Sequence, residues 1–198
     1  MINQSTLETP RLRLRPVELS DTSAIQKAAS AREIADTMIS LPHPYPAGEA
    51  DRYVARLEAE REAGHSVAFA IDQQMEGAFC GLIEIRKINR EHSQGELSFW
   101  LTAETWGRGY MIEVVQAMVR YGFETLGLNR LYAFHMLRNP ASGRVLEKNG
   151  FRQEGLLRQR VKKWGQFEDV ALWAILKQDW ATLTRCKDLP SACKYSAV

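Results

Sequence analysis

The sequence is poor in cysteine and has no long hydrophobic run. Its three cysteines, Cys80, Cys186 and Cys193, are odd in number and widely spaced, which argues against a disulfide framework or a zinc site and favours a reducing compartment. Charged residues interrupt the apolar stretches well before the length of a membrane-spanning helix. The chain starts without a basic segment followed by an apolar core, so we expect no secretory signal. We therefore expect a cytoplasmic protein with no membrane partner and no metal.

An excess of one charge and the common nucleotide-binding patterns are also missing. The 26 lysines and arginines nearly balance the 24 aspartates and glutamates, and a net charge of +2 is too small to indicate a nucleic-acid partner. The chain has no G-x-x-x-x-G-K-[ST], and Ile112 occupies the place of the third glycine of G-x-G-x-x-G. A nucleotide-hydrolysing or dinucleotide-binding protein is therefore disfavoured.

The composition and the apolar spacing are those of one globular domain. With 198 residues, 45% of them hydrophobic, the chain can bury a substantial core. We predict one domain over residues 1–184 and a loose C-terminal tail over 185–198, which shows no periodicity. Helices between strands that are joined by short turns indicate a mixed α/β sheet. The periodicity predicts helices at 47–63, 107–126 and 140–149, and strands at 12–17, 67–71, 79–88, 97–101, 130–137, 151–162 and 169–176.

The segment Glu104-Thr105-Trp106-Gly107-Arg108-Gly109-Tyr110-Met111 stands between a predicted strand and the long predicted helix. Two glycines one residue apart allow a tight bend that turns several N–H groups towards one point. The start of the helix adds unsatisfied donors and a partial positive charge, and Arg108 adds a full one. These features predict a phosphate or pyrophosphate site. A plain turn that only starts the helix is the alternative.

A second candidate segment, Arg138 to Phe151, follows the next predicted strand. Asn139 offers both donor and acceptor groups and is a good N-cap beside Pro140. Ser142 lies in the first turn of the helix that follows. It is therefore a candidate site residue, with a purely structural capping role as the alternative.

The order of these segments resembles the GNAT acetyltransferase superfamily, and within it the subgroup of ribosomal-protein N-terminal (alanine) acetyltransferases. The resemblance implies an α/β (α+β) fold: a mixed, mostly antiparallel sheet of about seven strands with flanking helices and splayed central strands. It also implies direct transfer of acetyl from acetyl-CoA to a primary amine, such as a protein N-terminal amine, and it allows a homodimer. The resemblance runs from about residue 8 to 177 and is carried by Thr9-Pro10-Arg11-Leu12-Arg13-Leu14-Arg15, Glu96 to Leu101, Trp106 to Met111, Asn139 to Ser142, Glu147 to Phe151 and Glu154-Gly155.

The resemblance also implies where acetyl-CoA binds. The family's phosphate loop has the form [QR]-x-x-G-x-[GA], which here is Glu104 to Gly109, so Glu104 departs from the usual first residue and is expected to point away. The strand through Phe99 to Leu101 would bind pantetheine through its backbone, next to a strand that splays from it. Asn139 would hydrogen-bond the pantetheine, and Ser142 would sit near the sulfur. The implied cofactor-binding residues are Phe99, Trp100, Leu101, Trp106, Gly107, Arg108, Gly109, Tyr110, Met111, Asn139, Ser142 and Arg144.

The reaction needs a base for the amine, a donor for the oxyanion and a proton for the leaving thiolate. A backbone N–H on the splayed strand, such as that of Leu101, is the expected oxyanion donor, and Ser142 is the candidate proton donor. No covalent enzyme intermediate is required. Cys80, inside a predicted strand, is a poor candidate for a nucleophile.

The base is the least determined role. Some relatives place a glutamate shortly after the E-G pair, but Val161 occupies that position here. Glu96, at the start of the splayed strand, is the first candidate for the base, and Glu84 on the preceding strand is the second. Each has the alternative of a solvated or salt-bridged strand residue. His135 could titrate near neutrality, but a satisfied structural histidine is the simpler interpretation.

The acceptor site is expected opposite the coenzyme, among the early helices and the late hairpin. Tyr45, in the proline-rich loop at 42–46, and Trp164, in a late turn, are the candidate substrate-binding residues, with loop anchoring as the alternative. An N-terminal amine, an amino acid, a polyamine or an aminoglycoside antibiotic would suit the same core. A non-catalytic acyl-CoA-binding module, suggested by Val161, and a nucleotide-binding regulatory protein are the remaining alternatives.

Overall fold

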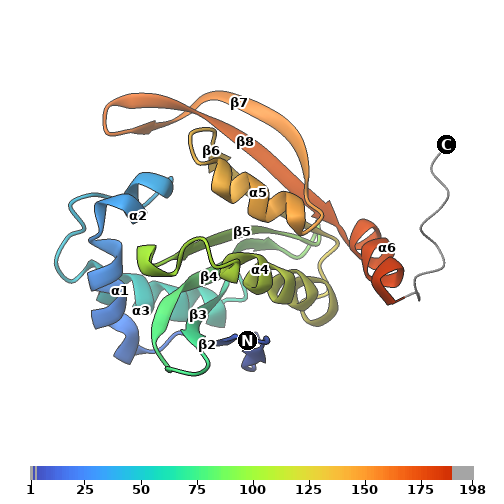
Figure 1. Cartoon of the computed structure of the whole chain (residues 1–198), viewed down its shortest axis with the longest axis horizontal. Helices are drawn as coiled ribbons and strands as arrows, with labels where there is room; N and C mark the ends of the chain where they lie inside the picture. Colours follow the sequence, from blue (N-terminus) through green and yellow to red (C-terminus); the bar gives the residue numbers. More distant parts are fainter. Residues whose placement is uncertain (1, 3, 189–198) are drawn as a thin grey trace.

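The protein folds around one eight-stranded sheet, as the computed structural model shows (Figure 1). The structure describes residue 2 and residues 4–188. The strand order is β1-β2-β3-β4-β5-β6-β8-β7, and the one parallel pair in this sheet is β5–β6. The strands are β1 (Leu7–Glu8), β2 (Leu12–Pro16), β3 (Val67–Gln73), β4 (Phe79–Asn89), β5 (Gln94–Leu101), β6 (Arg130–Met136), β7 (Arg152–Lys163) and β8 (Gln166–Leu176). The predicted mixed, mostly antiparallel sheet is confirmed, with eight strands rather than about seven because the short β1 pairs with β2.

Within the described part of the chain, six α-helices accompany the sheet. They are α1 (Thr22–Ala29), α2 (Arg32–Thr37), α3 (Glu49–Glu62), α4 (Tyr110–Arg120), α5 (Pro140–Lys148) and α6 (Lys177–Asp188). Two clusters of buried side chains show which face each helix covers. One cluster joins α4 to the sheet through residues such as Val115 and Ile83, and the other joins α1 and α3 to it through residues such as Ile25 and Leu82. The sheet is therefore covered on both faces.

The central strands β5 and β6 part soon after they meet. They pair from Gln94 to Glu96 on β5 and from Arg130 to Tyr132 on β6, and the pairing ends there. Beyond this point β5 stays paired with β4 as far as Leu101, and β6 stays paired with β8 as far as Met136. The expected splay of the central strands is thus present, and it opens a gap along one edge of β5.

The long predicted helix at 107–126 is shorter than expected. Its α-helical part begins at Tyr110, after Gly109 in the left-handed conformation, and gives way at Tyr121 to a π-helical turn that ends at Thr125. Gly122 in this turn lies close to the sheet, where an added Cβ would stand 3.0 Å from a Leu131 methyl. The apolar spacing continues through the π-turn, which explains why the sequence pattern alone does not reveal the change.

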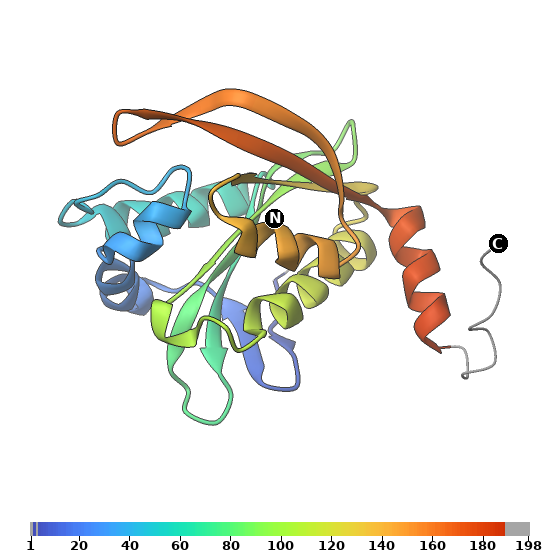
Figure 2. The ribbon, with the colours of Figure 1, turned by 45° about the horizontal axis from the view of Figure 1, so that its top comes forward.

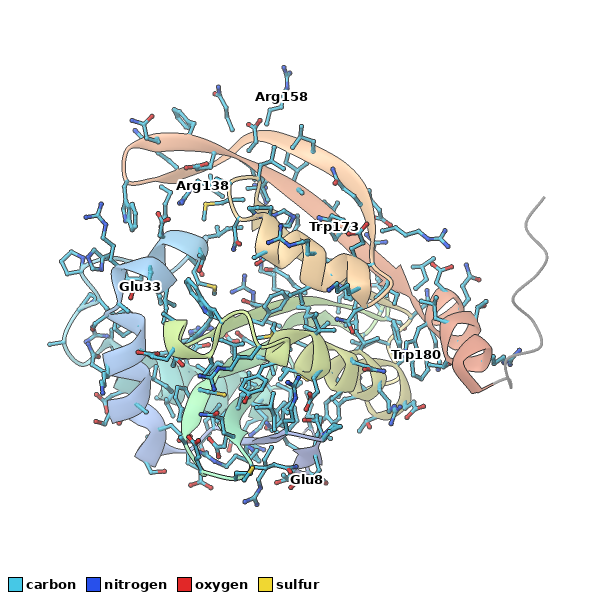
Figure 3. All side chains as sticks on the ribbon, in the orientation of Figure 1. Glu8, Glu33, Arg138, Arg158, Trp173 and Trp180 are labelled. Atoms are coloured by element: carbon cyan, nitrogen blue, oxygen red, sulfur yellow. The ribbon has the colours of Figure 1, made fainter. Side chains whose placement is uncertain are left out.

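The C-terminal half ends in a long hairpin and a helix. The β7–β8 hairpin arches over the molecule towards α2, and α6 projects at the opposite side (Figures 1 and 2). The predicted tail from residue 185 is wrong at its start, because α6 continues to Asp188; residues 189–198, with Cys193, lie outside the described part of the chain. Trp180 of α6 packs on Phe123, with ring centroids 5.5 Å apart, and this contact holds the helix against the body (Figure 3).

Candidate active site

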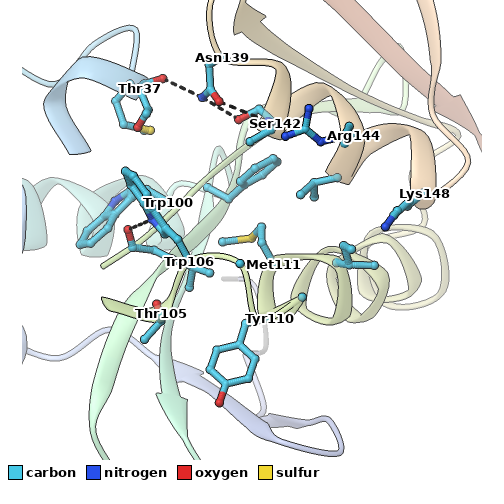
Figure 4. A pocket seen from close by; sticks show the side chains of 18 residues that line it. Thr37, Trp100, Thr105, Trp106, Tyr110, Met111, Asn139, Ser142, Arg144 and Lys148 are labelled. Carbon is cyan, nitrogen blue, oxygen red and sulfur yellow. Dashed lines mark hydrogen bonds between the residues drawn. The ribbon is translucent and has the colours of Figure 1, made fainter. Parts of the chain in front are cut away.

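A cleft of about 410 Å³ lies where β5 and β6 part, between the start of α4 and helix α5. We call it the main cleft (Figure 4). Its volume is typical of a small-molecule site. It is lined by Thr37, Met38, Phe99, Trp100, Leu101, Thr105, Trp106, Gly107, Gly109, Tyr110, Met111, Ile112, Asn139, Ala141, Ser142, Arg144, Val145 and Lys148. Most of the predicted cofactor-binding residues therefore meet in one place.

The glycine loop forms one end of the main cleft. Gly107 and Gly109 both have φ of 76°, a left-handed conformation that other residues rarely adopt, and Gly109 is the N-cap of α4. The first N–H groups of a helix have no partner within it, and the helix dipole favours an anion at this point. Glu104 is exposed and lies outside the lining of the cleft. The loop is therefore built as an anion site.

The segment before β2, which we call the N-terminal arm, holds this loop in position from outside the cleft. Arg11 donates to the Arg108 carbonyl (3.0 Å) and to the Glu113 carboxylate (2.9 Å), and its guanidinium lies 4.7 Å from the centre of the Tyr110 ring. The Thr9 hydroxyl donates to the same carboxylate at 2.5 Å. The segment before β2 thereby fixes the first turn of α4. Arg108 is itself exposed, so its contribution to the site is its backbone and a surface charge.

The free edge of β5 forms the floor of the main cleft. The Thr102 N–H donates to the Cys80 carbonyl on β4 at 2.8 Å. Because N–H groups along a strand alternate between its two edges, those of Leu101 and Phe99 point to the edge that β6 has left. On that edge the Leu101 carbonyl already accepts a bond from the Trp106 indole N–H (2.9 Å). Two backbone donors thus face the cleft.

Asn139 and Ser142 stand across the cleft at the start of α5 (Figure 4). The Asn139 side-chain N–H donates to the Ser142 hydroxyl oxygen at 3.0 Å and to the Thr37 carbonyl at 3.4 Å. The Asn139 amide oxygen accepts from the Ser142 backbone N–H, as an N-cap does. Since the Ser142 oxygen accepts a bond here, its own hydrogen remains available for a group in the cleft.

Two cations line the cleft at the side of α5. Arg144 was expected there, but Lys148 was not. Residues four apart on a helix share one face, so the spacing from Arg144 could have revealed Lys148. Thr37 and Met38, which were also missed from the sequence, come from α2 and the loop after it. No local sequence pattern marks these two as part of a site.

A second, smaller cavity of about 70 Å³ lies on the opposite face of β5, under α1 and α3. We call it the small cavity. It shares Met38 and Trp100 with the main cleft, so these two side chains form the wall between them. It is lined by Ile25, Ala29, Met38, Ser40, Leu41, Tyr45, Tyr53, Arg56, Leu82, Glu84, Arg86, Ser98 and Trp100. The small cavity is thus lined by two predicted site residues that do not line the main cleft, Tyr45 and Glu84, and by Trp100, which lines both.

The two candidate bases have different surroundings. Burial would raise the pKa of Glu96, but hydrogen bonds and charges from Lys87 and Arg86 outweigh it and hold the pKa below its usual range. Within the described residues, Glu96 lines neither cavity. Glu84 is also buried, and burial raises its pKa despite a 2.7 Å hydrogen bond from Ser66 and the nearby positive charge of Arg86. Only Glu84 combines access to a cavity with a raised pKa.

The tip of the β7–β8 hairpin holds the loop after α2. Lys163 is buried and donates to the Met38 carbonyl at 2.9 Å and to the Leu41 carbonyl at 2.5 Å; burial lowers its pKa. Trp164 is half-exposed, 6.1 Å from the His43 ring, and the Arg32 guanidinium lies 5.4 Å from it. Trp164 therefore has the contacts of a loop anchor.

Arg138 makes a second connection, between β8 in the C-terminal half of the chain and α2 in the N-terminal half. It donates to the Glu168 carboxylate on β8 at 2.8 Å and forms a 2.8 Å ion pair with Asp36 on α2. Figure 3 shows its side chain between the hairpin and α2. Together with Lys163 and Asn139, it fastens the residues around Met38 to the C-terminal half of the chain.

His135 and Cys80 have structural surroundings. His135 is buried, its Nδ1 lies 2.9 Å from the Met136 carbonyl, and its Nε2 accepts from the Trp173 indole N–H at 3.0 Å. Both ring nitrogens are thus engaged. Cys80 is completely buried, and burial raises its pKa to about 12. A thiol with so high a pKa is not a nucleophile near neutral pH.

Comparison with known proteins decides the family. Residues 11–152 match the family model described as an acetyltransferase (GNAT) domain. The chain belongs to the GNAT acetyltransferase family. The GNAT relative p20 of Bacillus licheniformis, an uncharacterized N-acetyltransferase, is 30% identical over 89% of this chain and 98% of its own length. The ribosomal protein uS5-alanine N-acetyltransferase of Escherichia coli (strain K12) is 27% identical over 70% of this chain and 71% of its own.

A solved GNAT structure has the same fold. It is RimL, a ribosomal L7/L12 alpha-N-protein acetyltransferase in complex with coenzyme A, with a TM-score of 0.81 at 19% identity over 87% of this chain and 98% of that one. The predicted family and fold are confirmed. As a GNAT N-acetyltransferase, the protein uses acetyl-CoA to acetylate an amine. Among the described residues no helix is long and apolar enough to cross a membrane, and no three His, Cys, Asp or Glu side chains form a metal-binding group.

Proposed function

We propose that the enzyme binds acetyl-CoA along the main cleft and transfers the acetyl group directly to the α-amino group of a protein N-terminus. In this arrangement the pyrophosphate meets the Gly107–Gly109 loop, and the pantetheine follows the free edge of β5. The N–H of Leu101 stabilises the oxyanion that forms when the amine attacks. Arg144 and Lys148 at the side of the cleft attract the phosphates of the coenzyme.

The observation that carries the mechanism is the hydroxyl group of Ser142. It lines the cleft, and its oxygen is oriented by the Asn139 side chain at 3.0 Å. Its hydrogen is therefore free to bond the thiolate that leaves when the C–S bond breaks. No covalent enzyme intermediate is needed, which agrees with the inert surroundings of Cys80.

The acceptor class rests on two supports. The relative from Escherichia coli is named for the alanine of ribosomal protein uS5. An α-amino group also has an ordinary pKa of about 7.7–8.0, compared with about 10.4 for a lysine side chain, so it is more readily neutral and nucleophilic. We therefore expect a peptide N-terminus to react in preference to an alkylamine.

The test uses acetyl-CoA, two control ligands and two peptides. Calorimetry should show that the full chain binds acetyl-CoA in preference to ATP and NAD. Release of free thiol should then occur with a peptide that has an N-terminal alanine. A matched peptide with a blocked N-terminus and one internal lysine should release little. Binding of ATP but not acetyl-CoA would contradict the site, and equal rates with both peptides would contradict the acceptor class.

The role of Ser142 is tested by replacing it. Ser142→Ala should leave the Kd for acetyl-CoA nearly unchanged and lower kcat by about ten- to a hundredfold. This loss is at the low end for general acids, because a thiolate is a good leaving group and needs little help from an acid. Ser20→Ala, at an exposed position in the 3₁₀ turn directly before α1, is the matched control. A wild-type kcat in Ser142→Ala would remove this hydroxyl from the mechanism.

A further inference from the structure

Two side chains close one end of the main cleft. Met38 and Trp100 are the two residues, among those that the structure describes, that line both the main cleft and the small cavity. We call them the end wall. Figure 4 shows Trp100 at the end of the cleft where Thr37 and Ser142 lie, away from Lys148. A molecule that extends along the cleft in this direction meets the end wall before it reaches the small cavity.

Trp100 is the rigid half of the end wall. Its side chain is buried, and its indole ring makes an edge-on contact with the Phe79 ring, at 6.0 Å between ring centroids. Its backbone lies within the β4–β5 pairing, opposite Leu82. Because a closely packed interior leaves little room for other rotamers, the indole has nowhere to move for a larger ligand.

Met38 combines a fixed backbone with an adaptable side chain. Its N–H donates to the Ile34 carbonyl at 3.2 Å, and its carbonyl accepts from the Lys163 ammonium group at 2.9 Å. The preceding carbonyl, that of Thr37, accepts from the Asn139 side chain at 3.4 Å. The half-buried methionine side chain is unbranched and fills irregular space. The position of the backbone is therefore fixed, and the length of the side chain decides how far the end wall reaches.

Apolar side chains surround the end wall on the side of the small cavity. Met38 and Leu41 pack against a buried cluster that contains Ile25, Leu82 and Trp100. The small cavity itself has a volume of about 70 Å³. Shortening the side chain of Met38 would vacate space next to this cluster and join it to the small cavity. The end wall thus separates the main cleft from room that a longer apolar group could use.

The proposed position of the coenzyme brings its acyl group to the end wall. In that arrangement the sulfur lies near Ser142, and the thioester oxygen meets the N–H of Leu101. Trp100 directly precedes Leu101 on β5, and it lies at the same end of the cleft as Ser142 (Figure 4). The methyl group of an acetyl ends the chain at this point. A longer acyl chain would have to displace Met38, and forcing extra methylene groups into packed space is unfavourable.

We infer that Met38, backed by Trp100, restricts the acyl group that the enzyme transfers to acetyl. The inference rests on the proposed placement of acetyl-CoA in the main cleft, and it adds the residue that selects the chain length of the donor. Met38 acts by occupying space and takes no part in the bond changes. Acetyl-CoA is then a good donor, and butyryl-CoA, whose acyl chain is longer by two methylene groups, is a poor one.

The first experiment compares Met38→Ala with Met38→Leu, using the N-terminal alanine peptide as the acceptor. In the wild type, kcat/KM should be about 10- to 200-fold lower with butyryl-CoA than with acetyl-CoA. In Met38→Ala this ratio should shrink by at least about tenfold, because the vacated space accepts the longer chain. Met38→Leu nearly conserves the volume and should keep the wild-type ratio. Met75→Ala, at a fully exposed position, should keep it too.

A second measurement separates chain-length selection from catalysis. The thioethers S-ethyl-CoA and S-butyl-CoA lack the carbonyl group and cannot transfer an acyl group. Calorimetry should show that the wild type binds S-ethyl-CoA at least about tenfold more tightly, and that Met38→Ala loses this preference. Equal wild-type Kd values for the two thioethers, or an unchanged preference in Met38→Ala, would overturn the inference alone.

The same data identify a failure of the proposed function. A wild-type chain that selects S-ethyl-CoA in this way but acetylates no amine would contradict the proposed function and support the role of Met38. A chain that binds neither thioether would overturn both, because the coenzyme would then not occupy the main cleft.

Discussion

Glu84 and Glu96 point to the same face of the sheet, on neighbouring strands, but their electrostatic partners differ. The register places Glu96 opposite Arg86, and it places Glu84 opposite Ser98. Glu96 thus forms two salt bridges, at 2.8 Å to Lys87 and a shorter one to Arg86, whereas Glu84 has a neutral hydrogen-bond donor. The Glu96 carboxylate is thereby fixed by two cations, whereas the Glu84 carboxylate lines the small cavity with a raised pKa.

The salt bridges of Glu96 should appear in the stability of the fold. We expect Glu96→Gln to lower the free energy of unfolding at pH 7 by about 2–3 kcal/mol, less than for a fully buried pair because Lys87 is exposed. The folded-state pKa of Glu96 is lowered, so the contribution is complete above the ordinary glutamate pKa of about 4.3 and is lost as the pH falls through the folded-state pKa.

Urea unfolding of the wild type and Glu96→Gln between pH 7 and pH 3.5 measures this effect. The difference between them should stay constant down to about pH 5 and shrink below about pH 4.3. Glu91→Gln, at an exposed position in the β4–β5 turn, should match the wild type. A difference that does not vary with pH would show that the salt bridges are not its source.

At the scale of elements, the main cleft depends on contacts between distant segments. The arm before β2 fixes the first turn of α4, and the hairpin tip fixes the loop after α2. Each tie joins residues about a hundred positions apart in the chain. The elements themselves form from local patterns, but the geometry of the cleft comes from these long-range contacts.

The arm before β2 should therefore influence coenzyme binding without touching the coenzyme. Arg11→Ala removes the bonds to Arg108 and Glu113, and we expect it to cost roughly 1 kcal/mol of acetyl-CoA affinity, about a fivefold rise in Kd. Arg13→Ala is the matched control, because this exposed arginine has only a 3.5 Å contact with the exposed Glu8. If calorimetry gave equal Kd values for acetyl-CoA in the two variants, the arm would not be positioning the loop that binds the coenzyme.

The sequence predicts the elements better than it predicts the site. Periodicity predicts the mixed sheet and the positions of most helices, and motif order predicts the family, whose resemblance implies the splay of the central strands. These predictions are confirmed. The boundaries fail where packing decides them, as at the π-turn after Arg120 and in α6, which is held by Trp180. The assignment of site residues stays a prediction.

There is a physical reason why only some features of the site can be predicted from the sequence. The loop of Gly107 and Gly109 is recognisable because the required backbone conformations leave a glycine pattern. The difference between Glu84 and Glu96 leaves no such trace, because it depends on which residue stands opposite each in the β4–β5 register. The contact between Met38 and Lys163 likewise cannot be recognised from a local sequence pattern, because 125 positions separate the two residues.

At the scale of the whole molecule, the two halves of the chain meet along a short seam. Three residue pairs join β5 to β6, between Gln94–Glu96 and Arg130–Tyr132. The main cleft is lined from both halves, by β5 and the start of α4 on one side and by α5 on the other. A ligand in the cleft therefore adds contacts across the place where the sheet itself has few.

Acetyl-CoA should accordingly stabilise the fold as one unit. At a concentration 100 times its Kd, a ligand of the native state adds about 2.7 kcal/mol of stability. For a chain of this size, that corresponds to a rise in Tm of roughly 5–10 °C. Thermal unfolding with acetyl-CoA, and with ATP as the control, measures it, and amide exchange should slow in both β5 and α5. Slowing confined to one half would contradict binding across the seam.

The gap that opens between β5 and β6 has a kinetic consequence. Under the proposed function both reactants must meet at this gap before any bond changes, because no covalent enzyme intermediate forms. Initial-rate plots should then intersect rather than run parallel, and free coenzyme A should compete with acetyl-CoA for the main cleft.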